Sequence, residues 1–211
     1  MDWVTISALA TAAGTLVLAV ATFASVRSAN RAARVAERAL FAGLRPLLIP
    51  SRPGDPEVKV GFADRKWLRV PGGGGAADAT DEAVYLAISV RNASTGIAVL
   101  HGWRLWPGRR RAAEDTTPDP ASFHQLTRDL YVPAGDLGFW QGAYRDPASA
   151  EYAEARAAIQ AGESLTIDLL YGDLEGGQRI ASRFVLDPRG EGDGYVASVA
   201  RHWNIDQADP R

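Results

Sequence analysis

Chemistry in this chain would have to use carboxylates and three histidines, because the sequence contains no cysteine. Asp173 and Glu175 lie close together in sequence, and His202 follows near the C-terminus. Two carboxylates with different pKa values and an imidazole could exchange protons with a substrate, which would make the chain a hydrolase or a transferase. Acidic residues are equally common in tight turns. We favour the turn interpretation and keep the enzyme as the alternative.

Motifs for other kinds of chemistry are missing. The histidines His101, His124 and His202 have no partner at metal-ligand spacing. No Gly-x-Ser-x-Gly nucleophile motif occurs. The glycine run at positions 72–75 is not followed by the Gly-Lys-Ser/Thr ending of a phosphate loop. We therefore expect no catalytic residue, no metal and no cofactor, and we predict that the glycine run is a flexible loop.

Aromatic side chains could line a binding groove or fill a core. The set comprises Trp103, Trp106, Trp140, Trp203, Phe139 and Tyr144. A core role is the favoured interpretation. The tail Arg201-His202-Trp203 is unusually aromatic and basic for a terminus that frays, so it either docks on the domain or meets a partner. Together with Asp173 and Glu175 it forms the candidate interaction surface.

The N-terminal segment predicts a transmembrane helix. Residues from Trp3 to Val26 include no charged side chain, and as a helix they span roughly 36 Å against a hydrocarbon core of about 30 Å. Trp3 stands where an interfacial aromatic anchor is expected. Serine and threonine hydroxyls within the segment can bond back to the preceding turn. A signal peptide and a buried core helix are the other interpretations, but only Met1 and Asp2 precede the apolar run.

Four arginines follow the apolar run and set the expected orientation. Arg27, Arg31, Arg34 and Arg38 are spaced by four, three and four residues, which places them on one helical face. Basic residues next to a membrane span stay in the cytoplasm. We therefore expect a protein of the cell (inner) membrane with its N-terminus outside and its C-terminal domain in the cytoplasm, where the lack of cysteine is ordinary.

The basic helix has two expected partners. Its arginines could lie on anionic lipid headgroups, at about 1 kcal/mol for each residue near the surface. Alternatively the helix could self-associate through a heptad seam, with Ala10 and Gly14 allowing close approach in the bilayer. The seam comprises Val26, Ala29, Ala33, Ala36, Leu40 and Gly43. We favour the lipid bilayer as partner and keep self-association as the alternative.

Beyond the helix, charge argues against nucleic acid as a partner. The whole chain has a formal charge of −2 and residues 1–45 carry +3, so residues 46–211 carry −5. Phosphate contacts supply most nucleic-acid affinity and need basic surfaces.

Alternating hydrophobicity predicts short strands with turns between them. The clearest runs are Ala83–Arg91, where four aliphatic residues share one face, and the pair Glu163–Tyr171 and Arg179–Leu186. A helix with Asp146 as N-cap is expected through Ala158, closed by Gly162. Residues 194–204 fit a strand or a short helix. Further strands are expected at residues 46–49, 57–62, 66–70, 97–106 and 130–132.

These elements predict a mainly β fold. We expect an immunoglobulin-like antiparallel β-sandwich with one short helix, preceded by the long N-terminal helix. The expected organisation is a transmembrane helix at residues 1–26, a basic juxtamembrane helix at 27–44 and the β-sandwich domain at 45–211.

The chain resembles uncharacterised single-pass membrane proteins of bacteria, of an actinobacterial type, that carry a small β-sandwich. Such proteins often have an Arg-Pro step after the helix, here Arg45-Pro46, and a turn of the form Asn-x-Gly-x-Gly-Pro-Ala. In residues 92–98 the turn matches at Asn92, Gly96 and Ala98 and departs at Ser94 and Ile97. The stretches 171–179 and 201–203 are also similar. The resemblance implies a fold and a location, and no activity.

The expected function is therefore a membrane-tethered binding or scaffolding module. The alternative remains a membrane-anchored hydrolase or transferase that uses Asp173, Glu175 and His202. A partner for the module is expected to be the lipid bilayer together with a protein, or a second copy of the chain.

Overall fold

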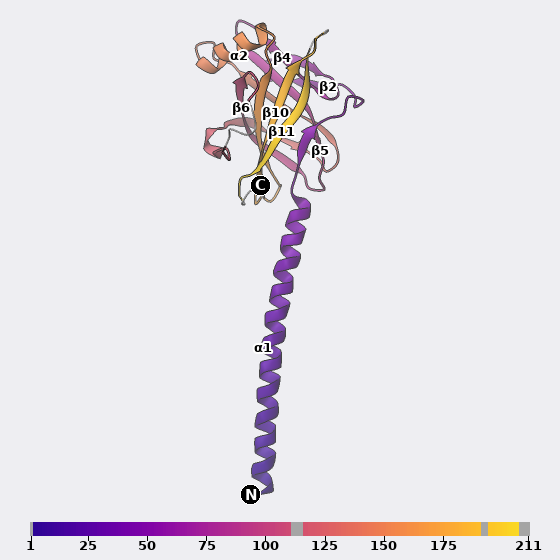
Figure 1. The fold of residues 1–211 in the computed structure, drawn as a ribbon, viewed down its shortest axis with the longest axis vertical. Coiled ribbons are helices and arrows are strands. Elements are labelled where there is room, and N and C mark those ends of the chain that lie inside the picture. Colours follow the sequence, from indigo (N-terminus) through magenta and orange to yellow (C-terminus); the bar gives the residue numbers. More distant parts are fainter. Residues whose placement is uncertain (1, 111–115, 191–193, 207–211) are drawn as a thin grey trace. The chain divides into compact units, whose positions relative to one another are not determined.

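The computed structural model describes residues 2–110, 116–190 and 194–206. The chain divides into two compact units, Met1–Gly43 and Leu44–Arg211. Figure 1 shows a long helix in the first unit and a β-rich domain in the second.

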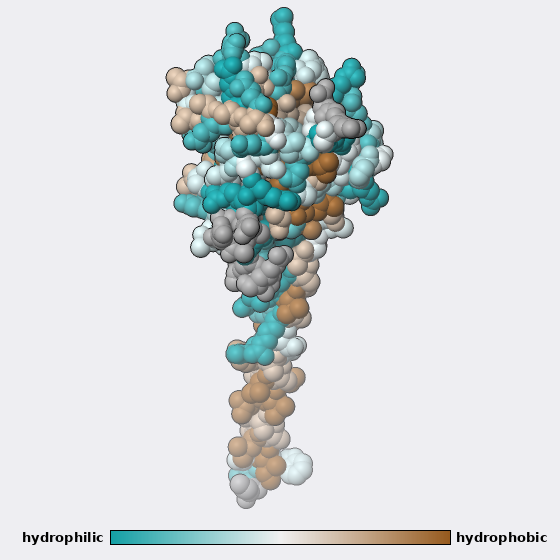
Figure 2. Space-filling view, turned by 45° about the horizontal axis from the view of Figure 1, so that its top comes forward, coloured by the Kyte–Doolittle hydropathy of each residue, from teal (hydrophilic) through white to brown (hydrophobic). Residues whose placement is uncertain are grey.

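Helix α1 (Trp3–Leu44) has no buried residue. It is long and apolar enough to cross a membrane, and Figure 2 shows hydrophobic side chains along its N-terminal part and hydrophilic ones after them. The expected back-bonding is present: the hydroxyls of Ser7, Thr11 and Thr15 each donate to a backbone carbonyl one turn earlier, at 2.9 Å. These bonds satisfy the polar groups within the helix itself, as a lipid environment requires.

The second unit contains eleven strands, one α-helix and a 3-10 turn in its described residues. Their order is β1 (Leu48–Pro50), β2 (Val58–Gly61), β3 (Trp67–Val70), β4 (Gly74–Ala79), β5 (Val84–Asn92), β6 (Ala98–Pro107), η2 (Pro120–Ser122), β7 (His124–Val132), β8 (Leu137–Tyr144), α2 (Ala150–Gln160), β9 (Leu165–Gly172), β10 (Arg179–Pro188) and β11 (Tyr195–Asn204).

Nine of these strands form one antiparallel sheet. Its ladder runs β8-β5-β4-β11-β10-β9-β6-β7, and β1 pairs with the C-terminal end of β5. The first and last strands of this path, β8 and β7, are neighbours in sequence, so the sheet curls round until its two ends approach each other. The hairpin β2–β3 forms a separate two-stranded sheet.

The central core lies inside the curled sheet. Alternate residues of β5 point into it, among them Leu86 and Ile88, and they meet Ile167 and Leu169 of β9. Helix α2 adds Tyr152, Ala155 and Ala158 to the same core, and Figure 1 shows it near one end of the sheet.

The outer face of the sheet is covered in two places. The β2–β3 hairpin packs Val60 and Val70 against Tyr85 and Ala87, the outward residues of β5. On the other side, Trp203 packs with Phe123, Leu170 and Ala181. Strands β5 and β9 are therefore buried on both faces.

The expected mainly β fold with a long N-terminal helix is confirmed. The pairing differs from two separately hydrogen-bonded sheets, because it runs without a break through all nine strands. The strands expected at 83–91, 163–171 and 179–186 are present with ends shifted by a few residues, and residues 195–204 form a strand.

The glycine run was wrongly predicted to be a flexible loop. Gly74 and Gly75 are buried at the start of β4 and pair with Val196 and Tyr195 of β11. A Cβ at Gly74 would lie 2.7 Å from the Tyr195 carbonyl oxygen, and one at Gly75 would lie 2.8 Å from a methyl of Leu186. Glycine stands at these positions because neighbouring backbone and side-chain atoms fill the space that a Cβ would need.

The predicted start of the short helix was also wrong. Ser149 is the N-cap of α2 and accepts from the Tyr152 N–H at 3.2 Å, while Asp146 accepts from the Ala148 N–H one turn earlier. Gly162 follows the helix at φ +64°, as its left-handed closing position requires.

Substitution of Gly74 by alanine should destabilise the domain by about 1–3 kcal/mol, because the methyl group would press on a backbone oxygen that cannot rotate away. Gly177→Ala is the matched control, since a Cβ there meets nothing within 4 Å. Urea unfolding of the full chain in detergent, followed by tryptophan fluorescence, measures both. Equal stability of the two variants would contradict this account of the glycine run.

Candidate binding cleft between the ends of the sheet

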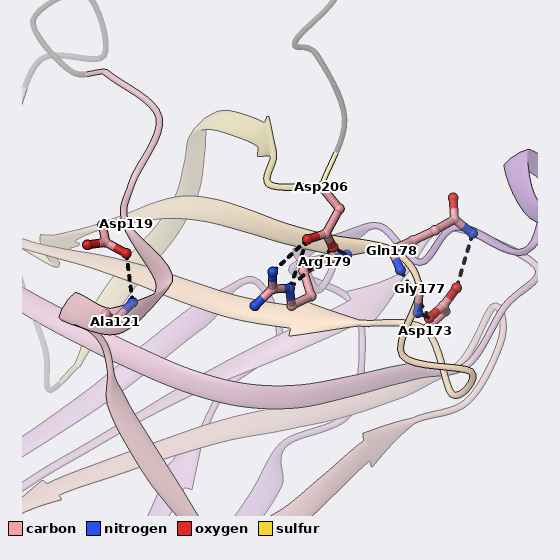
Figure 3. Close-up of polar contacts among 7 residues, drawn as sticks. All are labelled: Asp119, Ala121, Asp173, Gly177, Gln178, Arg179 and Asp206. Atoms are coloured by element: carbon pink, nitrogen blue, oxygen red, sulfur yellow. Dashed lines mark hydrogen bonds and ion pairs between the residues drawn. The ribbon is translucent and has the colours of Figure 1, made fainter.

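Asp173 stabilises the turn between β9 and β10. Its Oδ1 accepts from the N–H groups of Gly177 at 2.8 Å and Gln178 at 3.3 Å, and its Oδ2 accepts from the Gln178 side-chain amide at 3.1 Å (Figure 3). Glu175 is exposed in the same turn. The turn interpretation therefore accounts for the contacts of Asp173.

The residues of the C-terminal strand separate onto two faces of the sheet. Trp203 is 1% exposed in the outer cluster, and Arg201 stacks on its ring, with the guanidinium carbon 5.1 Å from the ring centroid. His202 lies between them in sequence, and its Nδ1 is 2.6 Å from the Ser182 hydroxyl. The structure brings Asp173, Glu175 and this strand to one end of the sheet, but it does not gather the five side chains on one surface.

The contact between His202 and Ser182 belongs to a buried polar network. The Ser182 hydroxyl is also 2.7 Å from the Tyr171 hydroxyl, which accepts from the Leu48 N–H at 3.0 Å. Ser182 and Tyr171 are fully buried, so no substrate reaches this serine. The network fixes β1 to β9 and β10, and nothing in it favours the hydrolase alternative.

The C-terminal end of the described residues is held by an ion pair between Arg179 and Asp206. Asp206 accepts from the Arg179 backbone N–H at 2.7 Å and from its guanidinium at 2.6 Å (Figure 3). The hydrogen bonds from Arg179 lower the pKa of Asp206. The Asp119 carboxylate in the same view accepts from the Ala121 N–H and caps η2. These carboxylates hold loops in place.

A buried ion pair lies on the outer face of β9 and β10. Arg183 and Asp168 are opposite each other in the ladder and both fully buried, joined by bonds of 2.7 and 2.9 Å. The Arg183 guanidinium carbon lies 5.2 Å from the ring centroid of Trp106 and 5.0 Å from that of Trp203. Arg104 adds a third bond to Asp168 at 3.2 Å. Trp106 and Trp203 therefore shield this pair from water.

Strands β7 and β8, the two ends of the sheet, border a cleft that the sequence did not reveal. In the described residues β7 pairs with β6 alone and β8 with β5 alone, so the outer edge of each is open. A hollow of about 250 Å³ lies between them. We call it the aromatic hollow; residues 124–128 and 130 of β7 and residues 141–144 of β8 line it.

Three aromatic side chains form the floor of the aromatic hollow. Trp103 of β6 lies 4.9 Å from Tyr144 and 5.4 Å from His124 between ring centroids, and His124 lies 5.6 Å from Tyr144. Trp103 and Tyr144 belong to the central core, whereas His124 is exposed. Gly142 of β8 makes room for the floor, since a Cβ there would lie 2.8 Å from the Trp103 ring.

The rim of the aromatic hollow is basic. Arg128 of β7 donates to the Gln141 side chain of β8 at 2.7 Å and to the Gly61 carbonyl at 3.5 Å. Arg145 donates to Asp64 at 3.2 Å. The lining contains both arginines and His124 but no aspartate or glutamate. Because Asp64 offsets the charge of Arg145, the positive charge of the rim comes mainly from Arg128, whose contacts are to neutral groups.

Tyr144 keeps its proton at physiological pH. Burial raises its pKa, and the nearby carboxylates of Glu151 and Glu154 raise it further. A tyrosine with a raised pKa is a neutral hydrogen-bonding group and not a base. The floor can therefore recognise a ring or an aliphatic group by contact, and the rim can recognise an anion.

A second hollow lies further along the same two strands. It is lined by Tyr131 of β7, by Leu137, Gly138 and Phe139 of β8, and by Glu57, Val58 and Lys59 at β2, so it holds one acidic and one basic residue. Leu130 lines both hollows. We call the two hollows together the seam cleft. The bridge from Arg128 to Gln141 crosses it.

The expected membrane-anchor residues all lie on α1. Trp3 is 82% exposed, and Arg27, Arg31, Arg34 and Arg38 are exposed on the C-terminal half of the helix. Within the described residues, no group of three or more histidine, aspartate or glutamate side chains could hold a metal ion.

Comparison with known proteins finds no family whose model matches the chain, and no similar curated protein or solved structure. The resemblance to bacterial single-pass membrane proteins stays a prediction. The site must therefore be interpreted from its own geometry.

Substitution of Arg183 by methionine should cost about 3–5 kcal/mol of stability, because it leaves the Asp168 carboxylate buried without its main partner. The double variant Arg183→Met, Asp168→Leu should recover part of that loss. Arg179→Met is the control: it breaks the more exposed pair with Asp206 and should cost about 0–1 kcal/mol. Urea unfolding measures the stability of all three variants. Similar losses of stability for Arg183→Met and Arg179→Met would contradict the inference that the Arg183–Asp168 pair is shielded from water.

The Tyr144 side chain should make stability fall at alkaline pH. Its pKa is higher in the folded state than the ordinary value of about 10, so the folded state holds the proton more tightly. That contribution is complete below pH 10 and is lost as the pH rises above it. Unfolding free energies between pH 8 and 11 should therefore decline less steeply in Tyr144→Phe than in the wild type. Identical slopes would show that Tyr144 titrates normally.

Proposed function

We propose that this chain is a membrane-tethered binding module and that the seam cleft is its binding site. The observation that carries the proposal is the cleft itself: two open strand edges face a hollow with an aromatic floor and a basic rim. Pockets that combine an apolar floor with a few convergent polar groups are the usual form of binding sites. Aromatic and arginine side chains are also the residues that most often dominate binding energy.

The chemistry of the cleft suits recognition. The ring of Trp103 and the neutral hydroxyl of Tyr144 offer contact area and one hydrogen bond, while Arg128 offers a charge-assisted bond. Trp103 and Tyr144 are held by packing in the core and Arg128 by its bond to Gln141, so little side-chain freedom is lost when a ligand binds.

The tether is α1. An apolar helix with no buried residue is supported best by a lipid bilayer around it. The arginines on its C-terminal half favour a cell membrane with the β domain in the cytoplasm, and they suit anionic headgroups as a second lipid contact. Self-association through the alanine seam of the same helix is the competing use of this segment.

Cysteine labelling tests the orientation, since the natural chain has no cysteine to interfere. In intact spheroplasts a membrane-impermeant maleimide should label Asp2→Cys, because the N-terminus lies outside. Leu174→Cys, in an exposed turn of the β domain, should react only after the membrane is opened. Labelling in the reverse order would place the domain outside the cell.

Photo-crosslinking tests the binding site. A photoreactive benzoylphenylalanine in place of Gln125, at the cleft, should give a discrete adduct in cells under ultraviolet light. Arg128→Gln should strongly reduce the yield of the adduct, because the rim loses its charge. The same group in place of Glu175, in the exposed turn, is the matched control and should give none. Adducts from position 175, or an undiminished yield from position 125 in Arg128→Gln, would contradict the proposal.

A further inference from the structure

We propose that the seam cleft takes an extended acidic peptide segment, which adds as a strand between β7 and β8 and completes the sheet. This inference rests on the proposed function, because it names the occupant of the same cleft. Four features of the cleft support it.

The first feature is the pair of open edges. A strand edge presents a row of unpaired N–H and C=O groups, and an extended peptide can satisfy them by joining the sheet. Here the two edges belong to consecutive strands. In the described residues side-chain contacts and no ladder pairing join them: Arg128 with Gln141, His124 with Tyr144, and Val132 in the space beside Gly138. A single added strand would pair with both edges, whereas a folded surface could reach only one.

The second feature is length. The aromatic hollow and the second hollow follow the same two strands, with Leu130 lining both. An extended chain rises about 3.3 Å for each residue. It could pair between the strands at the aromatic hollow and continue over the surface of the second hollow, where Val132 fills the space beside Gly138. A compact small molecule would fill one hollow and leave the other empty.

The third feature is the alternation of chemistry across the sheet. Trp103 and Tyr144 belong to the core inside the curled sheet, whereas Arg128 contacts Gly61 in the hairpin that covers the outside. Successive side chains of a strand point to opposite faces. An inserted strand would therefore place one side chain on the aromatic floor and the next beside the guanidinium of Arg128.

The fourth feature is charge. No carboxylate lines the aromatic hollow, although the domain as a whole is acidic. Arg128 is its main cation, because the charge of Arg145 is offset by Asp64, and in the second hollow Lys59 stands beside Glu57. The described contacts of Arg128 are to neutral groups, the Gln141 amide and the Gly61 carbonyl. Charge complementarity thus favours glutamate or aspartate at the outward positions of the peptide. Charged residues on β7 also discourage nonspecific pairing of the edge, which a selective site requires.

The test uses the full chain in phosphatidylcholine nanodiscs and a ten-residue synthetic peptide in which glutamate alternates with valine and phenylalanine. Hydrogen–deuterium exchange should slow at the amides of β7 and β8 when the peptide binds. Arg128→Gln should weaken binding about tenfold, the loss of one charge-assisted hydrogen bond. Arg156→Gln on α2 removes the same charge outside the cleft and should leave the affinity unchanged.

Two further probes separate the peptide inference from the proposed function. A peptide with lysine in place of glutamate, or with methylated backbone nitrogens, should not bind; equal binding of either would overturn the inference. If phenylacetate binds in an Arg128-dependent way and the peptide protects no amide of β7 or β8, the cleft is a binding site for small anions and the peptide inference is wrong. If the peptide instead protects other segments and Arg128→Gln has no effect, both proposals fail.

Discussion

The pairing of β4 with β11 is the constraint on which the rest of the domain depends. This ladder contains two residue pairs, Gly75 with Tyr195 and Gly74 with Val196, yet it joins the β5 half of the sheet to the β10 half. Glycine is needed in this ladder because a Cβ at Gly74 would press on the Tyr195 carbonyl oxygen and one at Gly75 on the Leu186 side chain. Once the halves are joined here, β7 and β8 become the two ends of the sheet. The cleft between them is thus a consequence of a joint formed elsewhere in the fold.

The buried polar groups explain why the curled sheet keeps one arrangement. Arg183 and Asp168 must face each other across β9 and β10, since a shift of either strand by one residue would send its charge into the apolar core and leave the other charge buried without its partner. The network of Leu48, Tyr171 and Ser182 similarly fixes the short strand β1. A buried pair contributes little net stability compared with apolar residues, so its effect here is mainly on register. A fixed register in turn keeps Trp103 of β6 in place beneath the aromatic hollow.

Sequence patterns predicted the parts of the fold that depend on local alternation. Strand β5 places its aliphatic residues at alternate positions, and β9 and β10 do so over part of their length, so their positions were found from the sequence. Strand β8 was missed because glycines stand at positions 138 and 142, where Val132 and the tryptophan rings fill the space of a side chain. The sequence drew attention to Trp103, Trp140 and Tyr144, but it could not separate them from Trp203, which packs in another cluster. The open edges were beyond prediction, because they result from strand pairings between distant segments.

The charge distribution limits how an acidic ligand could bind this domain. Residues 46–211 carry a formal charge of −5, so at long range the domain repels an anion and should not speed its approach. At physiological salt the repulsion is screened beyond about 8 Å, and the local field of Arg128 then dominates, because Arg145 is paired with Asp64. Affinity would have to come from short-range terms, namely strand hydrogen bonds and burial of a side chain on the aromatic floor. A membrane tether offsets the slow approach, because it holds the domain at a high effective concentration next to membrane-bound partners. A domain that does not attract its ligand electrostatically from a distance, but is held at the membrane, suits a module that meets its ligand there.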